Sequence, residues 1–414
     1  MPRGFLWLIA AQFFSALADN ALLIVAIAQM AQIGSPLWWT PLLKFSFTLS
    51  YVLFAPWIGV LADAGAKSRL MMWMNALKML GALVLLCPLH PLLGFAIAGM
   101  GAAAYAPAKY GLVTEMVMPE KLVTANAWIE VSVVCAVLLG TVVGGLLVSD
   151  WFTGSTGALA VREVLADIAP HSGALGLSLL GVLSLYVIAA LLNLKIPDSG
   201  RRYGARWQSP HVMLVAFWAD NRRVWRDHEG GLSLAVTTLF WGVGATLQFI
   251  VLRWAQLGLN LPLDQAAYLQ GVVAVGVVGG AALAGWVVGI EQARRVLPLG
   301  IAMGLVVPWM SAVHSIEMAV VLLALVGALG GLFVVPMNAL LQHRGAILLT
   351  AGRSIAVQGF NENLSVLLVL GLYTALVAAD LPMNALLLGL GLGVAGCIAA
   401  LMWRKRGPVA KLAR

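Results

Sequence analysis

Charged residues are scarce in this sequence. Only 10% of its 414 residues are Asp, Glu, Lys or Arg, whereas 61% are hydrophobic. Soluble domains carry charges on about a quarter of their residues, and so few charges could not cover the surface of a water-soluble fold of this length. The composition therefore excludes a soluble globular protein and predicts an integral membrane protein.

Residues that usually carry enzyme or metal chemistry are also sparse. The three cysteines, Cys87, Cys135 and Cys397, stand inside apolar runs at spacings that match neither a metal site nor a disulfide framework. The six histidines are scattered, and the sequence has no phosphate-binding loop, no G-x-S-x-G motif and no H-x-x-x-x-D acyltransferase motif. We therefore expect no enzyme activity, no metal ion and no cofactor.

Long apolar runs dominate what is present. An α-helix needs about 20 apolar residues to cross the hydrocarbon core of a bilayer. The runs are continuous, whereas the strands of a membrane β-barrel alternate apolar and polar residues. The sequence thus predicts an all-α membrane protein, surrounded by membrane lipid, with twelve transmembrane helices. They are expected at about 5–33, 38–62, 70–88, 91–109, 123–149, 173–195, 231–257, 265–289, 295–313, 317–341, 352–378 and 382–403.

One long polar stretch divides these runs into two sets of six. Part of it, VMLVAFWADNRRVWRDH, combines apolar residues with arginines and predicts a short amphipathic helix on the membrane surface. The predicted parts of the chain are an N-terminal half at 1–195, a cytoplasmic linker at 196–230 and a C-terminal half at 231–414.

The basic residues are unevenly distributed along the chain. With the N-terminus in the cytoplasm, most lysines and arginines fall in cytoplasmic loops and in the C-terminal tail, and only Arg162 and Arg253 fall near the outer side. Such a bias sets the orientation of a membrane protein. We therefore expect both termini in the cytoplasm. The formal net charge of +8 indicates topology rather than nucleic-acid binding.

The clearest motif, GVLADAGAKSRLMM at 59–72, lies between the second and third apolar runs. Gly59 permits close approach of helices, and Asp63 at a helix end can pair with a basic residue or with a helix N-terminus of the other half. With Lys67 and Arg69, these residues resemble the motif between helices 2 and 3 of the major facilitator superfamily. We expect them to form a gating latch. The alternative is that they are the ordinary charges of a cytoplasmic hairpin.

This resemblance implies a fold of two six-helix halves. One spacing recurs, since Gly101 stands six residues before Pro107 and Gly330 stands six before Pro336. A parallel duplication of this kind is typical of major facilitator transporters. The corresponding loop of the second half, GWVVGIEQARR, lacks the aspartate, so we expect a single latch.

Four ionisable residues fall well inside predicted helices: Asp19, Lys78, Glu130 and Glu362. Each would cost roughly 2.5–3.5 kcal/mol at the centre of a lipid-facing helix, so we expect them to face the bundle interior, a wet cavity or one another. Asp19 and its neighbour Asn20 lie about halfway along the first helix, where a substrate would pass. The alternative for Asp19 is a structural ion pair with Lys78. Glu130 and Glu362 are predicted to join a polar belt beside the cavity.

Six stretches spread along the chain are the basis of a closer resemblance. They are AQFFSALADNALL (11–23), FAPWIGVLADAGAKSRLMM (54–72), GAAAYAPAKYGLVTE (101–115), TLFWGVGATLQF (238–249), GGLFVVPMNALLQHRG (330–345) and AVQGFNENLSVLLVLGLY (356–373). Together these stretches resemble the bacterial lysophospholipid transporters of the LplT type. The resemblance implies a transporter that moves a lysophospholipid, such as lysophosphatidylethanolamine, from the outer to the inner leaflet of the bacterial inner membrane. An acyltransferase on the cytoplasmic side would then restore the second acyl chain.

That resemblance also implies the substrate-binding residues. The family carries DNALL in helix 1 and PAKYG in helix 4, which here contain Asp19, Asn20 and Lys109. An amine-bearing head group would pair with Asp19, and a phosphate would pair with Lys109 or Arg253. Gln248 stands where the family has an arginine in helix 7, so Arg253, five residues on, is the candidate replacement.

Two other functions stay open at this point. A proton-coupled drug or metabolite antiporter of the same superfamily would use Asp19 or Glu362 as the proton carrier and would depend on a pH gradient. A non-transporting lipid-binding scaffold would retain lipid without moving it. The lysophospholipid transporter is the primary hypothesis, because sparse interior charge suits a substrate with one acyl chain and a small polar head.

Overall fold

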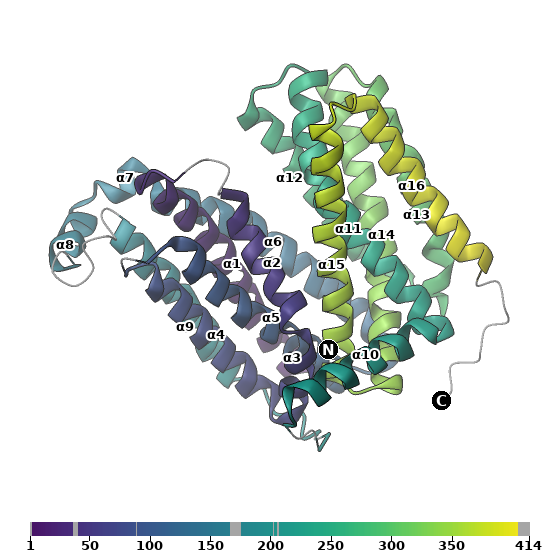
Figure 1. The fold of residues 1–414 in the computed structure, drawn as a ribbon, viewed down its shortest axis with the longest axis horizontal. Helices are drawn as coiled ribbons and strands as arrows, with labels where there is room; N and C mark the ends of the chain where they lie inside the picture. The colour runs from purple at the N-terminus through teal and green to yellow at the C-terminus, as the bar shows by residue number, and fades with distance from the viewer. Residues whose placement is uncertain are drawn as a thin grey trace. The chain divides into compact units, whose positions relative to one another are not determined.

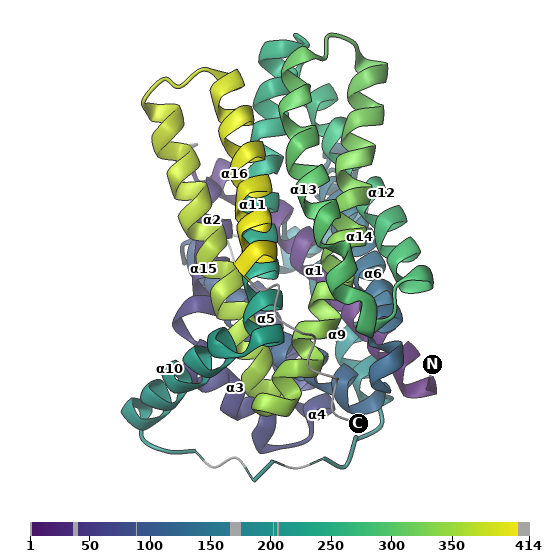
Figure 2. The ribbon, with the colours of Figure 1, turned by 90° about the vertical axis from the view of Figure 1, so that its right-hand side faces the viewer.

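The computed structural model describes residues 2–35, 40–87, 89–165, 175–201, 203–204 and 207–404, and all regular secondary structure within these ranges is helical (Figures 1 and 2). The arginine-containing tail at 405–414, on which the predicted topology partly rests, lies outside the described residues. The helices are α1 (Arg3–Gln32), α2 (Thr40–Leu53), α3 (Ala55–Ala64), α4 (Lys67–Val84), α5 (Pro91–Met116), α6 (Leu122–Val148), α7 (Asp150–Thr153), α8 (Thr156–Leu165), α9 (Gly176–Leu194), α10 (Pro210–Arg226), α11 (His228–Gly258), α12 (Leu263–Val287), α13 (Leu297–Val306), α14 (Ile316–Leu348), α15 (Ala351–Ala378) and α16 (Met383–Arg404).

The helices account for every predicted membrane span. Ten described helical segments are long and apolar enough to cross a membrane, and α2 with α3 makes an eleventh if this bent pair is one span. The remaining predicted span coincides with α4, which carries Lys67, Arg69 and Lys78 and is therefore the least apolar of the set. The prediction of an all-α membrane protein is confirmed, and each of the twelve predicted spans coincides with a helix or helix pair of the described chain.

Two predicted spans are not single α-helices. The run at 38–62 bends by 66° between α2 and α3, where Pro56 enters the first turn of α3. The run at 295–313 changes at Pro308 from α13 to a 3₁₀ helix at Val307–Ala312. Proline lacks the backbone N–H that a continuous helix requires and clashes with the preceding turn. The breaks therefore fall where proline interrupts an otherwise continuous apolar run.

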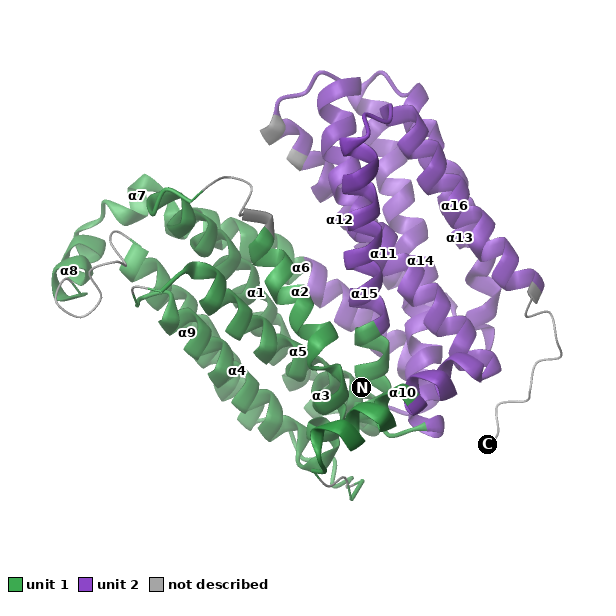
Figure 3. Cartoon of the chain, viewed as in Figure 1, with its two compact units in different colours: residues 1–116, 135–218, 349–360 green, residues 117–134, 219–348, 361–414 purple. Residues whose placement is uncertain are grey.

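Unit 1, one of two compact units, comprises residues 1–116, 135–218 and 349–360 (Figure 3). In it α1 packs against α9, α4 packs against α5 and α9, and α2 packs against α5. Its apolar core includes Leu22 and Val25 of α1 and Val182 of α9. Because lipid tails are as apolar as these side chains, helix association here depends on close van der Waals packing. This packed frame holds two polar clusters.

Unit 2 comprises residues 117–134, 219–348 and 361–414 (Figure 3). Its most extensive helix contact joins α12 to α14. A Cβ atom on Gly280 would lie 2.7 Å from the carbonyl carbon of Ala328, and one on Gly331 would lie 2.7 Å from the amide nitrogen of Ala281. Glycine is therefore required at these two positions for the two backbones to touch. We term this contact the glycine seam.

The compact units do not follow the predicted halves at every point. The first part of α6 belongs to unit 2, and the first part of α15 belongs to unit 1. The division at 1–195, 196–230 and 231–414 stays a prediction about domains. Within the linker, α10 is a helix that buries Met213 and Phe217 and exposes Trp218 and the arginines of its second half. Its placement on the membrane surface likewise stays a prediction.

Candidate functional site

A charged cluster lies inside unit 1 between α1, α4 and α9. Helical spacing puts Ser15 and Asp19 on one face of α1, and Asn75 and Lys78 on one face of α4. The Lys78 ammonium is 2.7 Å from Asp19 Oδ2 and donates to Ser15 Oγ at 2.9 Å. Ser15 in turn donates to Asn75 Oδ1 at 2.7 Å. These four residues and Tyr186 are termed the Asp19 cluster.

Aromatic side chains complete the Asp19 cluster. The Tyr186 hydroxyl on α9 donates to Asp19 Oδ1 at 2.8 Å. The ring centroid of Tyr105 on α5 is 5.0 Å from Lys78 Nζ, close enough for a cation–π interaction. The Lys78 side chain is 2% exposed and the Asp19 side chain 16%. Asp19 is thus the more exposed member of the ion pair.

The structure shows the ion pair that the sequence offers as one alternative for Asp19. A paired carboxylate with an accessible edge can still bind a head group, so the predicted role in substrate binding stays a prediction. Ser15, Asn75 and Tyr186 are absent from the predicted site. Ser15 stands one turn before Asp19, and Asn75 stands one turn before Lys78, so helical spacing carries a signal for both.

Lys109 lies against the same helix as Asp19. Its ammonium is 3.4 Å from Gln12 Oε1 on α1, and the residue is 9% exposed. Gln12 and Asp19 are two helical turns apart, which is about 10 Å along the axis. The structure therefore brings Lys109 and Asp19 to one face of α1. Asn20 instead donates its side-chain amide to the Ala16 carbonyl of its own helix at 2.8 Å.

The other predicted binding residues lie in unit 2. On α11, Gln248 is exposed and Arg253 is half-buried, and their spacing places them about 140° apart around the helix. Arg253 therefore does not occupy the position of Gln248. Glu130 on α6 is 6% exposed, and Glu362 on α15 is partly buried. Neither carboxylate is fully exposed, as intramembrane charges require, and a part in substrate binding stays a prediction for all four residues.

A second polar cluster in unit 1 surrounds Asp63 at the end of α3. The Asp63 carboxylate accepts hydrogen bonds from the backbone N–H groups of Gly352 at 2.9 Å and Arg353 at 3.1 Å, and from the Thr350 hydroxyl. The first N–H groups of a helix have no acceptor within it, and the helix dipole favours a negative charge there. Asp63 therefore caps the N-terminus of α15.

Lys67 links this cap to α5. Its ammonium is 3.4 Å from Asp63 Oδ1 and 2.8 Å from Glu115 Oε1, and the three side chains are at most 2% exposed. Buried charges are costly unless they are paired, and Lys67 pairs with both carboxylates. Arg69, also predicted as a gating residue, is exposed. Glu115 is absent from the predicted site. Asp63, Lys67, Glu115 and the N-terminus of α15 are termed the Asp63 cluster.

Gly59 brings α3 into direct contact with the start of α15. A Cβ atom at this position would lie 2.9 Å from Arg353 Cα, closer than packed backbones allow. We expect Gly59→Ala to push α3 off α15, to weaken the Asp63 cap and to lower the unfolding temperature by several degrees. Gly65→Ala is the matched control, because a Cβ atom there would meet nothing within 4 Å. Equal unfolding temperatures for the two variants, measured in detergent, would contradict the prediction.

Unit 2 repeats this helix contact without the aspartate. A Cβ atom on Gly285 of α12 would lie 2.7 Å from Ala127 Cβ on α6, and the Thr124 hydroxyl donates to the Gly285 carbonyl at 2.9 Å. Beside it, Asn126 and Gln342 exchange hydrogen bonds of 2.9 and 2.8 Å. The segment GWVVGIEQARR, which lacks the aspartate, thus still packs a glycine, Gly285, against the first part of α6. Neutral hydrogen-bonding groups stand there in place of the charged ones.

Asp227 caps α11 in unit 2. Its carboxylate accepts from Gly230 N at 2.7 Å and from Arg344 Nε and Nη2, both at 3.0 Å. Burial by itself would raise the pKa of Asp227, but the hydrogen bonds from Arg344 and Gly230 outweigh it and hold the pKa below its usual value. The resulting stabilisation is complete above the unfolded-state pKa of about 3.9, and it is lost as the pH falls through the lower, folded-state pKa.

We therefore expect Asp227→Asn to lower the unfolding temperature at neutral pH. The difference from the wild-type protein should shrink below about pH 4, where protonation removes the same charge. Tryptophan fluorescence during heating, repeated across this pH range, measures the difference. Asp150→Asn changes an exposed aspartate and is the matched control. A difference that does not change with pH would exclude the charge on Asp227 as its cause.

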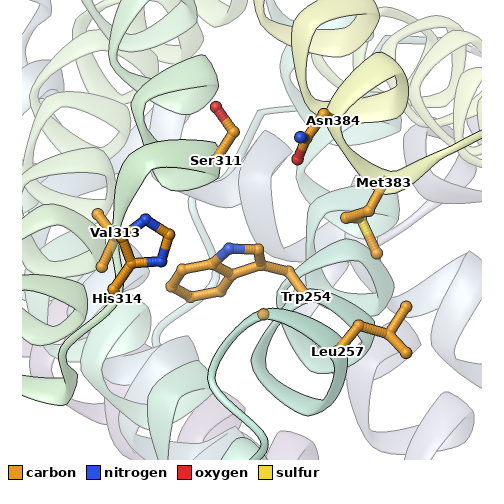
Figure 4. A pocket seen from close by; sticks show the side chains of 8 residues that line it. Trp254, Leu257, Ser311, Val313, His314, Met383 and Asn384 are labelled. Carbon is orange, nitrogen blue, oxygen red and sulfur yellow. The ribbon is translucent and has the colours of Figure 1, made fainter.

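A small cavity lies at one end of unit 2, near the ends of α11 and α16 (Figure 4). Its volume is about 150 Å³, and the Trp254 indole and the side chains of Ser311, His314 and Asn384 line it. Pockets for organic ligands usually measure about 300–1,000 Å³. This cavity is therefore too small for a molecule with a long acyl chain, and we assign no ligand to it.

The fold is shared with solved transporters. The Major Facilitator Superfamily transporter FucP in the outward conformation matches with a TM-score of 0.73 and 17% identity, over 97% of each chain, which confirms the predicted major facilitator fold. A bacterial homologue of the iron transporter ferroportin in an outward-facing state matches with a TM-score of 0.70 and 15% identity, over 98% of this chain and 100% of that one. At these identities the likeness concerns the fold alone.

The sequence defines the class of protein more closely. The family model described as Major Facilitator Superfamily matches residues 8–364. The lysophospholipid transporter LplT of Yersinia enterocolitica serotype O:8 is 41% identical over 93% of this chain and 90% of its own length. LplT of Yersinia pestis (strain Pestoides F) is 41% identical over 93% of this chain and 89% of its own. With relatives this similar along nearly its whole length, the chain belongs to the LplT family of the Major Facilitator Superfamily.

Proposed function

We propose that this protein is a lysophospholipid transporter. The observation that carries the proposal is the 41% identity to proteins named lysophospholipid transporter, which extends over 93% of the chain. The substrate is a lysophospholipid such as lysophosphatidylethanolamine, and it moves from the outer to the inner leaflet of a bacterial inner membrane. Both termini lie in the cytoplasm, as the distribution of basic residues favours.

The residues along α1 supply a binding site for a zwitterionic head group. The accessible edge of Asp19 would accept hydrogen bonds from the ammonium, and Lys109 would meet the phosphate. Lys78 and Tyr186 hold the Asp19 carboxylate in place. The ammonium of the head group would therefore share that carboxylate with the ammonium of Lys78. Asn20, Glu130, Gln248, Arg253 and Glu362 are further candidates for head-group contacts.

The Asp63 cluster would act as a latch during alternating access. Asp63 caps α15 through its backbone hydrogen bonds, and release of this cap would accompany the change of state. Gly59 and Lys67 support the latch by packing and by charge, and Arg69 is a further candidate. A cytoplasmic-side acyltransferase would consume the delivered lysophospholipid, because that molecule lacks one acyl chain.

Uptake of labelled lysophosphatidylethanolamine by proteoliposomes tests the proposal. We expect uptake that persists when the pH gradient is collapsed. Gradient-driven export of small amphiphiles without lipid uptake would instead support a proton-coupled drug or metabolite antiporter. Retention of bound lipid by purified protein that moves no substrate would support a lipid-binding scaffold. Protein-free liposomes provide the background rate.

A further inference from the structure

The start of the linker after α9 is bound to the Asp63 cluster. The Ser199 hydroxyl donates to Glu115 Oε2 at 2.5 Å. The ring centroid of Tyr203 lies 4.7 Å from Lys67 Nζ, within the range of a cation–π interaction, and the Tyr203 hydroxyl lies close to the Glu115 carboxylate. These residues all belong to unit 1. The linker therefore contacts Lys67 and Glu115, the other two charged side chains of the Asp63 cluster.

Glu115 and Lys67 are each held from more than one side. Glu115 uses Oε1 for Lys67, at 2.8 Å, and Oε2 for Ser199. Burial and the neighbouring Glu115 raise the pKa of Tyr203, so its hydroxyl stays protonated beside that carboxylate. A Cβ atom on Gly111 would lie 2.9 Å from Lys67 Cε, so the missing side chain of Gly111 leaves room for the lysine.

The local sequence DSGRRYG suits this arrangement. Gly200 and Gly204 have φ values of +72° and +62°, which side-chain-bearing residues rarely adopt. The Gly200 N–H donates to Asp198 Oδ1 at 3.0 Å, which closes a turn around Ser199. The linker is therefore shaped by its own residues next to α5, and Ser199 and Tyr203 reach the Asp63 cluster from it.

We propose that Ser199 and Tyr203 are positioning residues for the transport cycle, because they hold Glu115 and Lys67 where Lys67 keeps Asp63 on the N-terminus of α15. Without them the Glu115 carboxylate can leave its position, Lys67 loses a fixed partner, and the cap opens more readily. The effect on uptake rests on the proposed transport function, whereas the effect on the cap does not.

The test measures how often the cap opens. Ser354, in the first turn of α15, is 3% exposed. Ser354→Cys, in a background without the three native cysteines, reports opening through its rate of reaction with a maleimide in proteoliposomes. We expect Tyr203→Leu to accelerate labelling by about three- to tenfold, and Ser199→Ala to accelerate it less, as the loss of contacts to charged groups implies. Tyr203→Phe keeps the ring over Lys67 and should fall between the wild-type protein and Tyr203→Leu.

The controls distinguish positioning from general damage to the linker. Trp207→Leu removes an aromatic side chain of the same linker that is 64% exposed, and it should leave labelling unchanged. In a Glu115→Gln background, Tyr203→Leu should add little, since both act through Lys67. Unchanged labelling rates in both Tyr203→Leu and Ser199→Ala overturn the inference. It is also overturned if Tyr203→Leu accelerates labelling by the same factor in the Glu115→Gln background as in the wild-type background. Faster labelling in a protein whose wild-type form takes up no lysophosphatidylethanolamine supports the inference and counts against the proposed function.

Discussion

Lys78→Met is expected to abolish uptake of lysophosphatidylethanolamine and to lower the unfolding temperature sharply. Methionine has a similar length, so the substitution removes the charge rather than the volume. The Asp19 carboxylate would keep the Tyr186 hydroxyl as a partner but lose the cation at 2.7 Å. Breaking a buried ion pair by removing one member costs about 3–5 kcal/mol, because the other charge is left uncompensated.

The double variant Asp19→Asn/Lys78→Met separates stability from transport. Neither charge is left without its counter-ion, so most of the lost stability should return, while uptake should stay absent because Asp19 is the proposed head-group ligand. Lys121→Met, at an exposed lysine, is the matched control for the loss of a positive charge. Wild-type uptake by the double variant would remove Asp19 from the binding site, and a double variant as unstable as Lys78→Met would contradict the ion-pair explanation.

Asp63→Ala is the second change from which we expect a large effect, a loss of at least about tenfold in the initial rate of uptake. The substitution removes the acceptor for the N–H groups of Gly352 and Arg353, and a lost helix cap costs about 0.5–2 kcal/mol. It also leaves Lys67 with Glu115 as its remaining carboxylate. The state in which α15 is capped should therefore become less populated, and the steps of the transport cycle that pass through this state should slow.

Asp63→Asn refines this experiment. Asparagine keeps one side-chain oxygen that can accept from the α15 backbone but loses the charge that attracts Lys67, so an intermediate rate is expected. Asp150→Ala, at an exposed aspartate that begins α7, controls for the loss of a carboxylate elsewhere. If Asp63→Ala transports at the wild-type rate, the Asp63 cluster has a structural role and no part in gating.

The sequence predicts the helices well because each membrane span must by itself be long and apolar enough to cross the bilayer. Length and hydropathy determine where a span lies, so the predicted runs coincide with helices along the described chain. The same reasoning makes the pair of Asp19 and Lys78 foreseeable, because two opposite charges inside the membrane are cheapest together. The break between α2 and α3 could not be predicted from its proline alone, because Pro107 and Pro336 stand within the continuous helices α5 and α14.

The partners contributed by other helices are much harder to foresee. Glu115 and Tyr186 lie on helices distant in sequence from Lys67 and Asp19, and only the packing of unit 1 brings them within hydrogen-bonding distance. Arg69 illustrates the converse. It belongs to the recognised motif, yet it stands two residues from Lys67, and such residues point to different sides of a helix. The motif therefore identifies the place of the cluster but not its full membership.

The glycine seam between α12 and α14 limits how unit 2 can deform. Two backbones that already touch at Gly280 and Gly331 have little room to rotate against each other, so we expect the two helices to move together. A thicker or thinner bilayer that tilts α12 should then tilt α14 with it. We expect flexing within unit 2 at other joints, such as the junction of α13 with the 3₁₀ helix at Pro308.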